Sequence, residues 1–444
     1  MMRPPAVVCL ASLTALLFGC ASSPYDYAWV GREIERASGH APGDPTREPS
    51  LPPGITNLSA LGEGDAIAIA LWNNAAFGVE LAQLGASRAD LAQAGALPNP
   101  TLSFLLPIGP RQLEATLLFP LSALVERPFR VKAAKLDVER TARGLIQRGL
   151  DLARDVRVLW IEADAAKARV GVREDLAKTW GNVAKIAAAR RDAGDTPPFE
   201  SITAEADAQD AVDQLERAKT DLAASTERLR LVLGLSESSL GAKLGTNGAA
   251  MDEREPIDEG ALLSLALAAR PDVRAAEISV EAAGERIGWE KSRVFAMLGR
   301  FDVKPIGSQG GPPLLPLPGA QLEIPIFNRN PGGIGRAEAE LVGATLRYRQ
   351  LRQTIATDVR VARLELGQAL ASLHRFREVV LPLLEKAQAI ALSSFEAGAE
   401  PYLVVLEATR RLRDARLRKI DLEAAVRRAR ANLERHVGRR QDAL

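Results

Sequence analysis

Apolar and polar positions follow a helical period over most of this chain, and the clearest case runs from residue 127 to residue 192. No helix breaker occurs there after Pro128. Apolar or small residues recur in alternating steps of four and three, which is the 3.5-residue repeat of a coiled-coil seam. These residues are Leu145, Gly149, Leu152, Val156, Leu159, Ala163, Ala166 and Val170. At ~1.5 Å per residue, the pattern predicts a helix on the order of 100 Å long, too long for a globular domain.

The same arrangement occurs twice in the chain. Gly194 and Pro197 mark a turn, after which residues 200–233 return antiparallel. Gly398 and Pro401 mark a second turn at the same offset, after a helical run from 334 to 396. A turn and a helix length that recur in register indicate an internal two-fold repeat. We expect repeat 1 over 61–235 with its tip near 194, a linker over 236–256, repeat 2 over 257–438 with its tip near 398, and a tail over 439–444.

Each repeat also contains a predicted β-hairpin that follows a shorter helix. Leu102, Phe104 and Leu106 alternate with more polar residues in repeat 1, as do Leu322, Ile324 and Ile326 in repeat 2. The predicted elements are a helix at 65–96 and a hairpin at 100–120, then a helix at 259–297, interrupted at Arg270-Pro271, and a hairpin at 299–327 with a loop from Gly307 to Gly319.

Four such strands are too few to close a barrel. Charged side chains on alternate positions, such as Arg300 and Asp302, cannot face lipid and require a water-filled lumen. We therefore expect three copies to join, each with four transmembrane strands, in a trimeric 12-stranded β-barrel. The predicted fold class is mainly α with a small β part, in which long antiparallel coiled-coil helical hairpins form an α-barrel.

The N-terminus has the features of a lipoprotein signal. Residues 1–19 contain Arg3 and an apolar run that is too short to span a bilayer, as in a signal peptide. Leu17-Phe18-Gly19-Cys20 resembles a bacterial lipobox, whose cysteine becomes the lipidated first residue, although Phe18 stands where a small residue is usual. The alternative is an ordinary secretory signal. Residues 20–60 are rich in Pro, Gly and Ser and predict a lipid-anchored extended tether.

Composition removes several classes of function. The 57 basic and 56 acidic residues give a net charge of +1, which does not favour nucleic acid as a partner. The basic run from Arg410 to Lys419 is interleaved with acidic residues and predicts intrahelical and intersubunit ion pairs instead. Both cysteines lie in the first 20 residues, so the mature chain has no disulfide framework or thiolate metal site. His40, His374 and His436 stand far apart, without catalytic or metal-ligand spacing. We expect no enzyme, cofactor, resident metal or nucleotide-driven motor.

Four segments resemble the TolC family of outer-membrane efflux channels, also called outer membrane factors. The similarity as a whole covers nearly the whole mature chain, from about Leu61 to Gly438. The fourth strand is followed by Phe327-Asn328-Arg329-Asn330-Pro331, which is most similar to the CzcC-like cation-efflux branch, where the last position is more often Gln. The segments are 98–102, 269–276, 324–330 and the turn region 395–408, which contains Phe395-Glu396-Ala397-Gly398 and residues 402–408. The resemblance implies a homotrimer in outer-membrane lipid that extends into the periplasm and meets a periplasmic adaptor protein and an inner-membrane RND-type pump.

The turns and their acidic neighbours are the candidate site. Gly194, Pro197, Gly398 and Pro401 shape the two tips, which the resemblance implies are adaptor-docking surfaces. Repeated around a three-fold axis, inward-facing glutamates would form an acidic ring that favours cations at the entrance. The candidates for this ring are Glu385, Glu396 and Glu400; solvated helix charges are the alternative.

The function that fits these expectations best is a passive conduit from periplasm to exterior within a tripartite efflux pump. Its substrates, delivered by the pump, are expected to be heavy-metal cations or drugs. One alternative is the outer-membrane channel of a type I protein-secretion system. Another is a non-conducting periplasmic coiled-coil structural lipoprotein.

Overall fold

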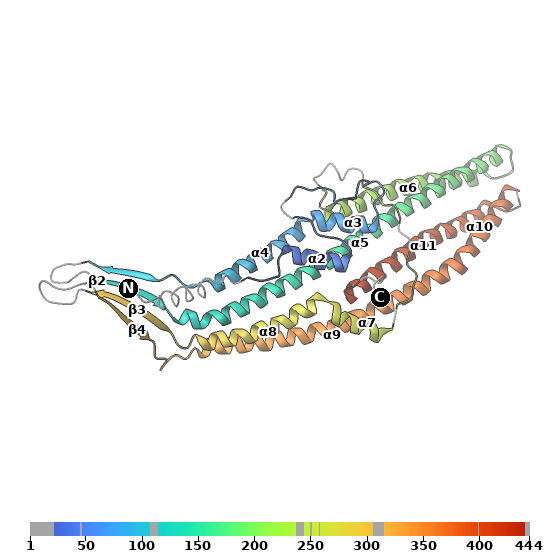
Figure 1. Cartoon of the computed structure of the whole chain (residues 1–444). Helices are drawn as coiled ribbons and strands as arrows, with labels where there is room; N and C mark the ends of the chain where they lie inside the picture. Colours follow the sequence, from blue (N-terminus) through green and yellow to red (C-terminus); the bar gives the residue numbers. More distant parts are fainter. Residues whose placement is uncertain are drawn as a thin grey trace. The chain divides into compact units, whose positions relative to one another are not determined.

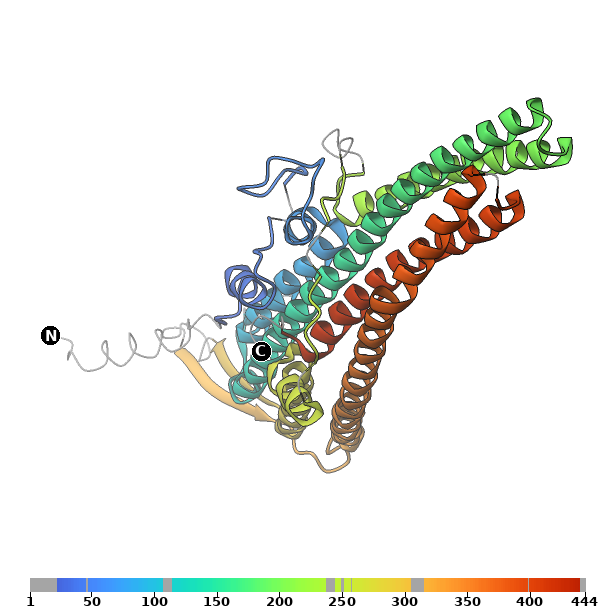
Figure 2. The same ribbon diagram turned by 90° about the vertical axis from the view of Figure 1, so that its right-hand side faces the viewer.

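The computed structural model describes residues 22–44, 47–106, 114–236, 244–248, 251–256, 258–304, 315–397 and 399–439. The predicted signal peptide, the lipidation site Cys20, Gly398 and residues 440–444 of the predicted tail lie outside the described residues. Figures 1 and 2 show the helices and strands of the chain from two sides. The chain divides into two compact units. The first unit comprises Met1–Val30, Glu80–Leu145 and Pro271–Gln353, and the second comprises Gly31–Val79, Ile146–Arg270 and Thr354–Leu444.

The first unit contains an antiparallel four-stranded sheet in the order β1-β2-β3-β4. Its register places Ser103 opposite Thr116 and Thr116 opposite Asp302. The Thr116 hydroxyl donates a hydrogen bond of 2.7 Å to Asp302 Oδ1 on this polar face. Leu102 and Phe301 stand on the other face, so the predicted alternation is present. The strands are β1 (Thr101–Leu105), β2 (Glu114–Pro120), β3 (Met297–Lys304) and β4 (Leu315–Leu322).

The predicted position of the fourth strand was wrong. β4 covers residues 315–322, part of which we expected to be a loop, and Ile324 and Ile326 lie beyond its end. Pairing ends soon after β4 because Pro325 has no N–H, and the Ile326 N–H donates to the Ile324 carbonyl at 2.8 Å. Pro316 and Pro318 fit within β4 because it is an edge strand of this sheet, where an N–H can be missing without loss of a ladder bond.

The helices follow the predicted pattern with two extra breaks. The helix expected at 65–96 is divided at Asn74, and the later one is divided at Arg270-Pro271 as predicted. The helix expected to run to Glu396 contains a π-helical turn, Phe376–Val380, whereas Pro382 lies in the first turn of the next helix. The helices are α3 (Glu63–Asn73), α4 (Ala75–Gly95), α5 (Ser122–Asp192), α6 (Pro198–Val232), α7 (Glu259–Ala269), α8 (Pro271–Ser292), α9 (Pro331–Arg375), α10 (Leu381–Glu396) and α11 (Tyr402–Val437).

Part of the predicted seam lies in the core of the second unit, whereas Leu152, Leu159 and Val170 are only half-buried. On α5, Val156, Ala163 and Ala166 are buried, and on α6 the buried residues include Ala204 and Leu229. Small residues along the seam let the helix backbones approach closely. α5 and α6 lie side by side as an antiparallel hairpin, as do α10 and α11 (Figure 1).

The extended tether expected over residues 20–60 was partly wrong. Residues Tyr27–Ser38 form helix α2, in which Val30 and Ile34 are fully buried. Asp26 accepts a hydrogen bond from the Trp29 N–H at 2.7 Å and so satisfies a donor of the first turn. Val30 and Ile34 are one turn apart, a helical spacing that the Pro- and Gly-rich composition obscured.

The prediction of a mainly α fold with a small β part is confirmed. Among the described residues, no helix combines the length and the apolar character needed to cross a bilayer.

Candidate functional site

The first predicted tip is a tight turn between α5 and α6. Gly194 has a φ of +81°, a left-handed conformation that favours glycine. The Gly194 N–H donates to the Arg191 carbonyl at 2.9 Å, and Pro197 immediately precedes α6. At the second tip, Pro401 holds the equivalent position before α11.

The three candidate glutamates do not lie together. Glu396 ends α10 and Glu400 lies in the turn that follows, whereas Glu385 lies eleven residues before Glu396 on the same helix. That separation is roughly 16 Å along an α-helix. All three side chains are exposed in the protomer. Glu396 and Glu400 can therefore contribute to one ring, and Glu385 belongs to a different level.

Beneath the tips, an aromatic cluster joins the two hairpins of the second unit. Tyr402 lies edge-on to Trp180 and to Phe395, with ring centroids 6.4 and 6.3 Å apart. The Arg190 guanidinium lies over the Phe395 ring at 4.9 Å. All three aromatic side chains are buried. The cluster also contains Leu176, Val183, Ala184, Ala187, Ala204, Ala208, Ala211, Val405 and Leu406.

One carboxylate, Asp207 on α6, holds two side chains of α11. The Tyr402 hydroxyl donates to Asp207 Oδ2 at 2.7 Å, and Arg410 Nη2 donates to Asp207 Oδ1 at 2.9 Å. The Asp207 side chain is only 17% exposed, so these charge-assisted bonds are partly shielded from water. Burial and the bond to Asp207 raise the pKa of Tyr402, which keeps the phenol a donor at physiological pH. We call Asp207, Tyr402 and Arg410 the latch.

A polar cavity of about 210 Å³ adjoins the latch. Arg173, Arg413 and Asp210 contribute to its lining. Burial and the neighbouring Arg413 charge lower the pKa of Arg173. The volume is sufficient for several water molecules, which could replace the latch bonds if the helices separated.

Ion pairs hold α11 against α5 further from the tips. Arg157 pairs with both Glu434 and Glu63 at 2.5 Å, and these three side chains are 15%, 15% and 26% exposed. Closer to the tips, Arg169 and Asp421 pair at 2.6 Å but are 40% and 58% exposed. Two further ion pairs join α11 to α5, Arg435–Asp151 and Arg427–Asp164, both at 2.8 Å. Breaking a pair of buried charges costs more than breaking an exposed pair, so α11 should be more sensitive to loss of Arg157 than to loss of Arg169.

Residues 252–254 of the predicted linker bind both α11 and the π-helical turn. Arg430, buried on α11, donates to the Asp252 carbonyl at 3.0 Å. Arg377, in the π-helical turn, donates to both oxygens of Glu253 at 2.7 and 3.0 Å. Hydrogen bonds from Arg254, with the nearby charge of Arg430, lower the pKa of Asp252 to about 2. π-Helical turns often mark places where a helix can bend, and here one is tied to α11 through residues 252–254.

The buried histidine near the end of α11 predicts acid sensitivity. Burial and Arg435, opposed by Asp358 at 3.5 Å, lower the pKa of His436 to about 4. The folded chain therefore favours the neutral ring. The corresponding contribution to the free energy of unfolding is complete above the ordinary pKa of about 6.5 and is lost as the pH falls toward 4. A shift of this size corresponds to about 3 kcal/mol. We expect the thermal midpoint of the native chain to fall over this range, and His436→Asn to remove much of that dependence.

The matched control is His374→Asn, because His374 is exposed. Differential scanning calorimetry at several pH values would compare the three proteins. An unchanged slope in His436→Asn would assign the acid sensitivity to other groups.

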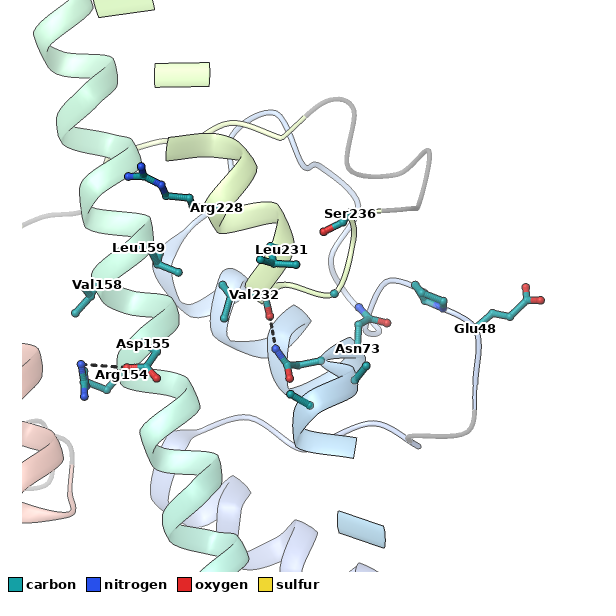
Figure 3. Close-up of a pocket in the computed structure, with 15 residues that line it drawn as sticks. Glu48, Asn73, Arg154, Asp155, Val158, Leu159, Arg228, Leu231, Val232 and Ser236 are labelled. Atoms are coloured by element: carbon teal, nitrogen blue, oxygen red, sulfur yellow. Dashed lines mark hydrogen bonds and ion pairs between the residues drawn. The ribbon is translucent and has the colours of Figure 1, made fainter. Parts of the chain in front are cut away.

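A wide groove of about 1370 Å³ lies elsewhere in the second unit (Figure 3). Val158, Leu159 and Leu231 line it, and Leu231 is 69% exposed. The Asn74 amide donates to the Val232 carbonyl at 2.8 Å and joins α6 to the start of α4. An open apolar groove suits contact with protein better than chemistry on a small molecule.

Metal ligation has no geometric support in the described part of the chain. No group of three or more His, Cys, Asp and Glu side chains could hold a metal ion among these residues.

Sequence reasoning missed the latch. It expected intrahelical and intersubunit partners for the basic run that contains Arg410, whereas Arg410 pairs with Asp207 on another helix of the same chain. It gave Asp207 no role, and it named Tyr402 only as part of a segment that resembles the family. A usable signal was present: the first half of α6 is rich in acidic residues, and the first half of α11 is rich in arginine. This complementarity could have suggested that the two helices face each other.

Comparison with known proteins places these features in context. Residues 317–439 match the family model described as "Outer membrane efflux protein". The chain is 27% identical to the cobalt-zinc-cadmium resistance protein CzcC of Cupriavidus metallidurans over 385 residues, covering 84% of this chain and 89% of CzcC. It is also 27% identical to SilC of Salmonella typhimurium, named a probable outer membrane lipoprotein, over 212 residues, or 45% of this chain and 44% of SilC.

The fold is shared with solved channel structures. The structure of CusC, described in terms of transmembrane channel formation, superposes with a TM-score of 0.72 at 19% identity. The match covers 90% of this chain and 98% of CusC.

Proposed function

Residues 317–439 match the outer membrane efflux proteins and most of the chain is similar to CzcC, and from that premise we propose that this chain is the passive conduit of a tripartite pump. It is an efflux channel of the outer membrane. Its substrates would arrive from an inner-membrane RND-type transporter through a periplasmic adaptor, and the chain would supply no energy of its own.

The observation that carries the proposal is that one chain combines an amphipathic four-stranded sheet with two long helical hairpins. The sheet has edge strands β1 and β4, and its polar face holds Thr116 and Asp302. Three copies joined edge to edge would give a closed 12-stranded barrel whose polar face lines a lumen. The exposed apolar groove at Leu231 supplies contact surface for such a homotrimer. Because of the internal two-fold repeat, the two hairpins of each protomer would occupy equivalent positions in the wall of the α-barrel.

The latch is proposed to keep the entrance closed. Hydrogen bonds that Tyr402 and Arg410 donate to Asp207 hold the α10–α11 hairpin near its tip, while Arg157 holds the other end of α11. Release of the latch would let this hairpin pivot, with the π-helical turn as its hinge. The adaptor would dock at the tips formed by Gly194 and Pro197 and by Gly398 and Pro401. Cys20 would carry the lipid that anchors the N-terminus.

We propose heavy-metal cations as the substrate class. The support is the similarity to CzcC over 84% of the chain, together with the carboxylates Glu396 and Glu400 at one tip. Carboxylate rings favour cations in a narrow pore. Two measurements test the proposal: conductance of the purified full-length protein in planar bilayers, and resistance of a deletion strain to metal ions and to organic compounds. Absence of conductance in both the native chain and the latch variant Asp207→Ala would contradict the conduit, and sensitivity confined to organic compounds would contradict the metal assignment.

Neutralising the proposed ring is expected to reduce cation selectivity. In the double variant Glu396→Gln with Glu400→Gln, six carboxylates would be removed from a trimer, so the reversal potential in a salt gradient should move toward zero. Glu385→Gln is the matched control, because it lies roughly 16 Å along the helix from Glu396. An equal effect of the control would place the selective ring elsewhere.

A further inference from the structure

The polar cavity beside the latch carries more positive than negative charge. It lies among α5, α6 and α11, where three guanidinium groups and two carboxylates contribute to its lining, together with Gln214 and apolar residues. The guanidinium groups belong to Arg173, Arg410 and Arg413, and the carboxylates belong to Asp207 and Asp210. One positive charge is therefore in excess around a space of about 210 Å³. Water can fill this space, but it does not neutralise the charge.

Arg173, on α5, is the guanidinium group without an acidic partner. It donates to the Gln214 amide oxygen, and among the described residues no carboxylate lies within ion-pair distance of it. The Gln214 amide nitrogen donates in turn to Asp210 Oδ2, so the neighbouring carboxylate is occupied by a neutral donor. A partly buried cation with a neutral partner keeps much of its cost of desolvation.

Arg413 brings a second guanidinium group to the same cavity from α11. Its Nε donates to Asp414 Oδ1 at 2.8 Å, but the Asp414 side chain is 67% exposed, whereas that of Arg413 is 23% exposed. A pair whose acidic member lies in water compensates little of the charge in the cavity. Burial and the charge of Arg413 lower the pKa of Arg173, so the two guanidinium groups disfavour each other.

The latch does not supply the missing negative charge. One oxygen of Asp207 already accepts from Tyr402 and the other accepts from Arg410. An oxyanion would bring both the charge and several free acceptor oxygens. Guanidinium groups bind phosphate through two parallel N–H groups, so a tetrahedral oxyanion can serve two arginines at once.

We propose that this cavity binds a small oxyanion, with inorganic phosphate as the model ligand, between Arg173 on α5 and Arg413 on α11. The anion would join the two helical hairpins beside the latch and so stabilise the closed entrance. This effect on the entrance rests on the proposed function, whereas binding itself requires only the folded second unit.

Isothermal titration calorimetry of the purified full-length protein with inorganic phosphate tests the site, with sodium chloride keeping the ionic strength constant. We expect saturable binding at one site per chain. Loss of a hydrogen-bonded charge should weaken the affinity roughly tenfold or more in Arg173→Gln and in Arg413→Gln. Arg173→Lys, which keeps the charge but loses the paired N–H groups, should have an intermediate affinity.

The matched control is Arg411→Gln. Arg411 lies on α11 near Arg413, but its side chain is 66% exposed and pairs with Glu407 one turn away. This variant should bind phosphate like the native chain. Absence of binding in the native chain, unchanged affinity in both cavity variants, or an equal loss in Arg411→Gln would each overturn the site. Circular dichroism checks that every variant is folded.

Conductance in planar bilayers tests the effect on the entrance separately. In Asp207→Ala, phosphate can take the acceptor position that the carboxylate leaves, so millimolar phosphate in a potassium chloride bath should lower the raised conductance severalfold. The double variant Asp207→Ala with Arg173→Gln should not respond. Binding without this response would reject the link to the entrance. A conducting channel that binds no phosphate would reject the site and leave the conduit standing.

Discussion

Replacing Asp207 by alanine is expected to open the channel, with a severalfold rise in conductance in planar bilayers. The variant removes the acceptor for both Tyr402 and Arg410. Hydrogen bonds to a charged group contribute about 1.5–3 kcal/mol each, and Arg410 is half exposed, so the closed state should lose about 3 kcal/mol per protomer. That loss corresponds to roughly a 100-fold change in the ratio of closed to open states.

The control is Asp213→Ala on the same helix. Asp213 is 56% exposed and pairs with Arg217 one turn further along α6. It should leave conductance unchanged. If Asp207→Ala conducts no better than this control, the latch does not hold the entrance closed.

Replacing Arg157 by alanine is expected to cause the largest loss of stability. Arg157 lies between Glu63 and Glu434, at 2.5 Å from each, and the change leaves both carboxylates without this partner. Removing one member of a buried ion pair costs about 3–5 kcal/mol. The thermal midpoint in detergent should fall markedly, and Arg157→Lys, which retains the charge, should recover part of the loss.

Arg169→Ala provides the comparison on the same helix. Its pair with Asp421 has a similar length, 2.6 Å, but both side chains are more than a third exposed. Exposed pairs contribute about 0–1 kcal/mol, so the midpoint should hardly change. Equal losses in the two variants would show that burial does not determine how much each ion pair between α5 and α11 contributes to stability.

These two variants separate the two ends of α11. Loss of the latch should change conductance with little effect on unfolding, whereas loss of Arg157 should destabilise the whole second unit. This difference is expected if the α10–α11 hairpin pivots while the Arg157 ion pairs keep the C-terminal end of α11 in place.

The sequence alone was sufficient for the helical hairpins and their seam. Val156, Ala163 and Leu229 are buried, as the seam predicts. Their burial was predictable because a coiled-coil period is visible along one helix. The left-handed Gly194 and the break at Arg270-Pro271 were predictable for the same reason, since backbone restrictions act over a few residues.

Only the tertiary structure decided which distant side chains meet. Asp207 is one of several acidic residues on α6, and nothing local distinguishes it until α11 places Tyr402 and Arg410 beside it. The limits of β4 depended on pairing with β3, and Ile34 became buried because other parts of the chain cover it. Periodicity records how one element alternates, whereas a latch, a strand register and a buried ion pair require two elements to come together, and that juxtaposition exists only in the folded chain.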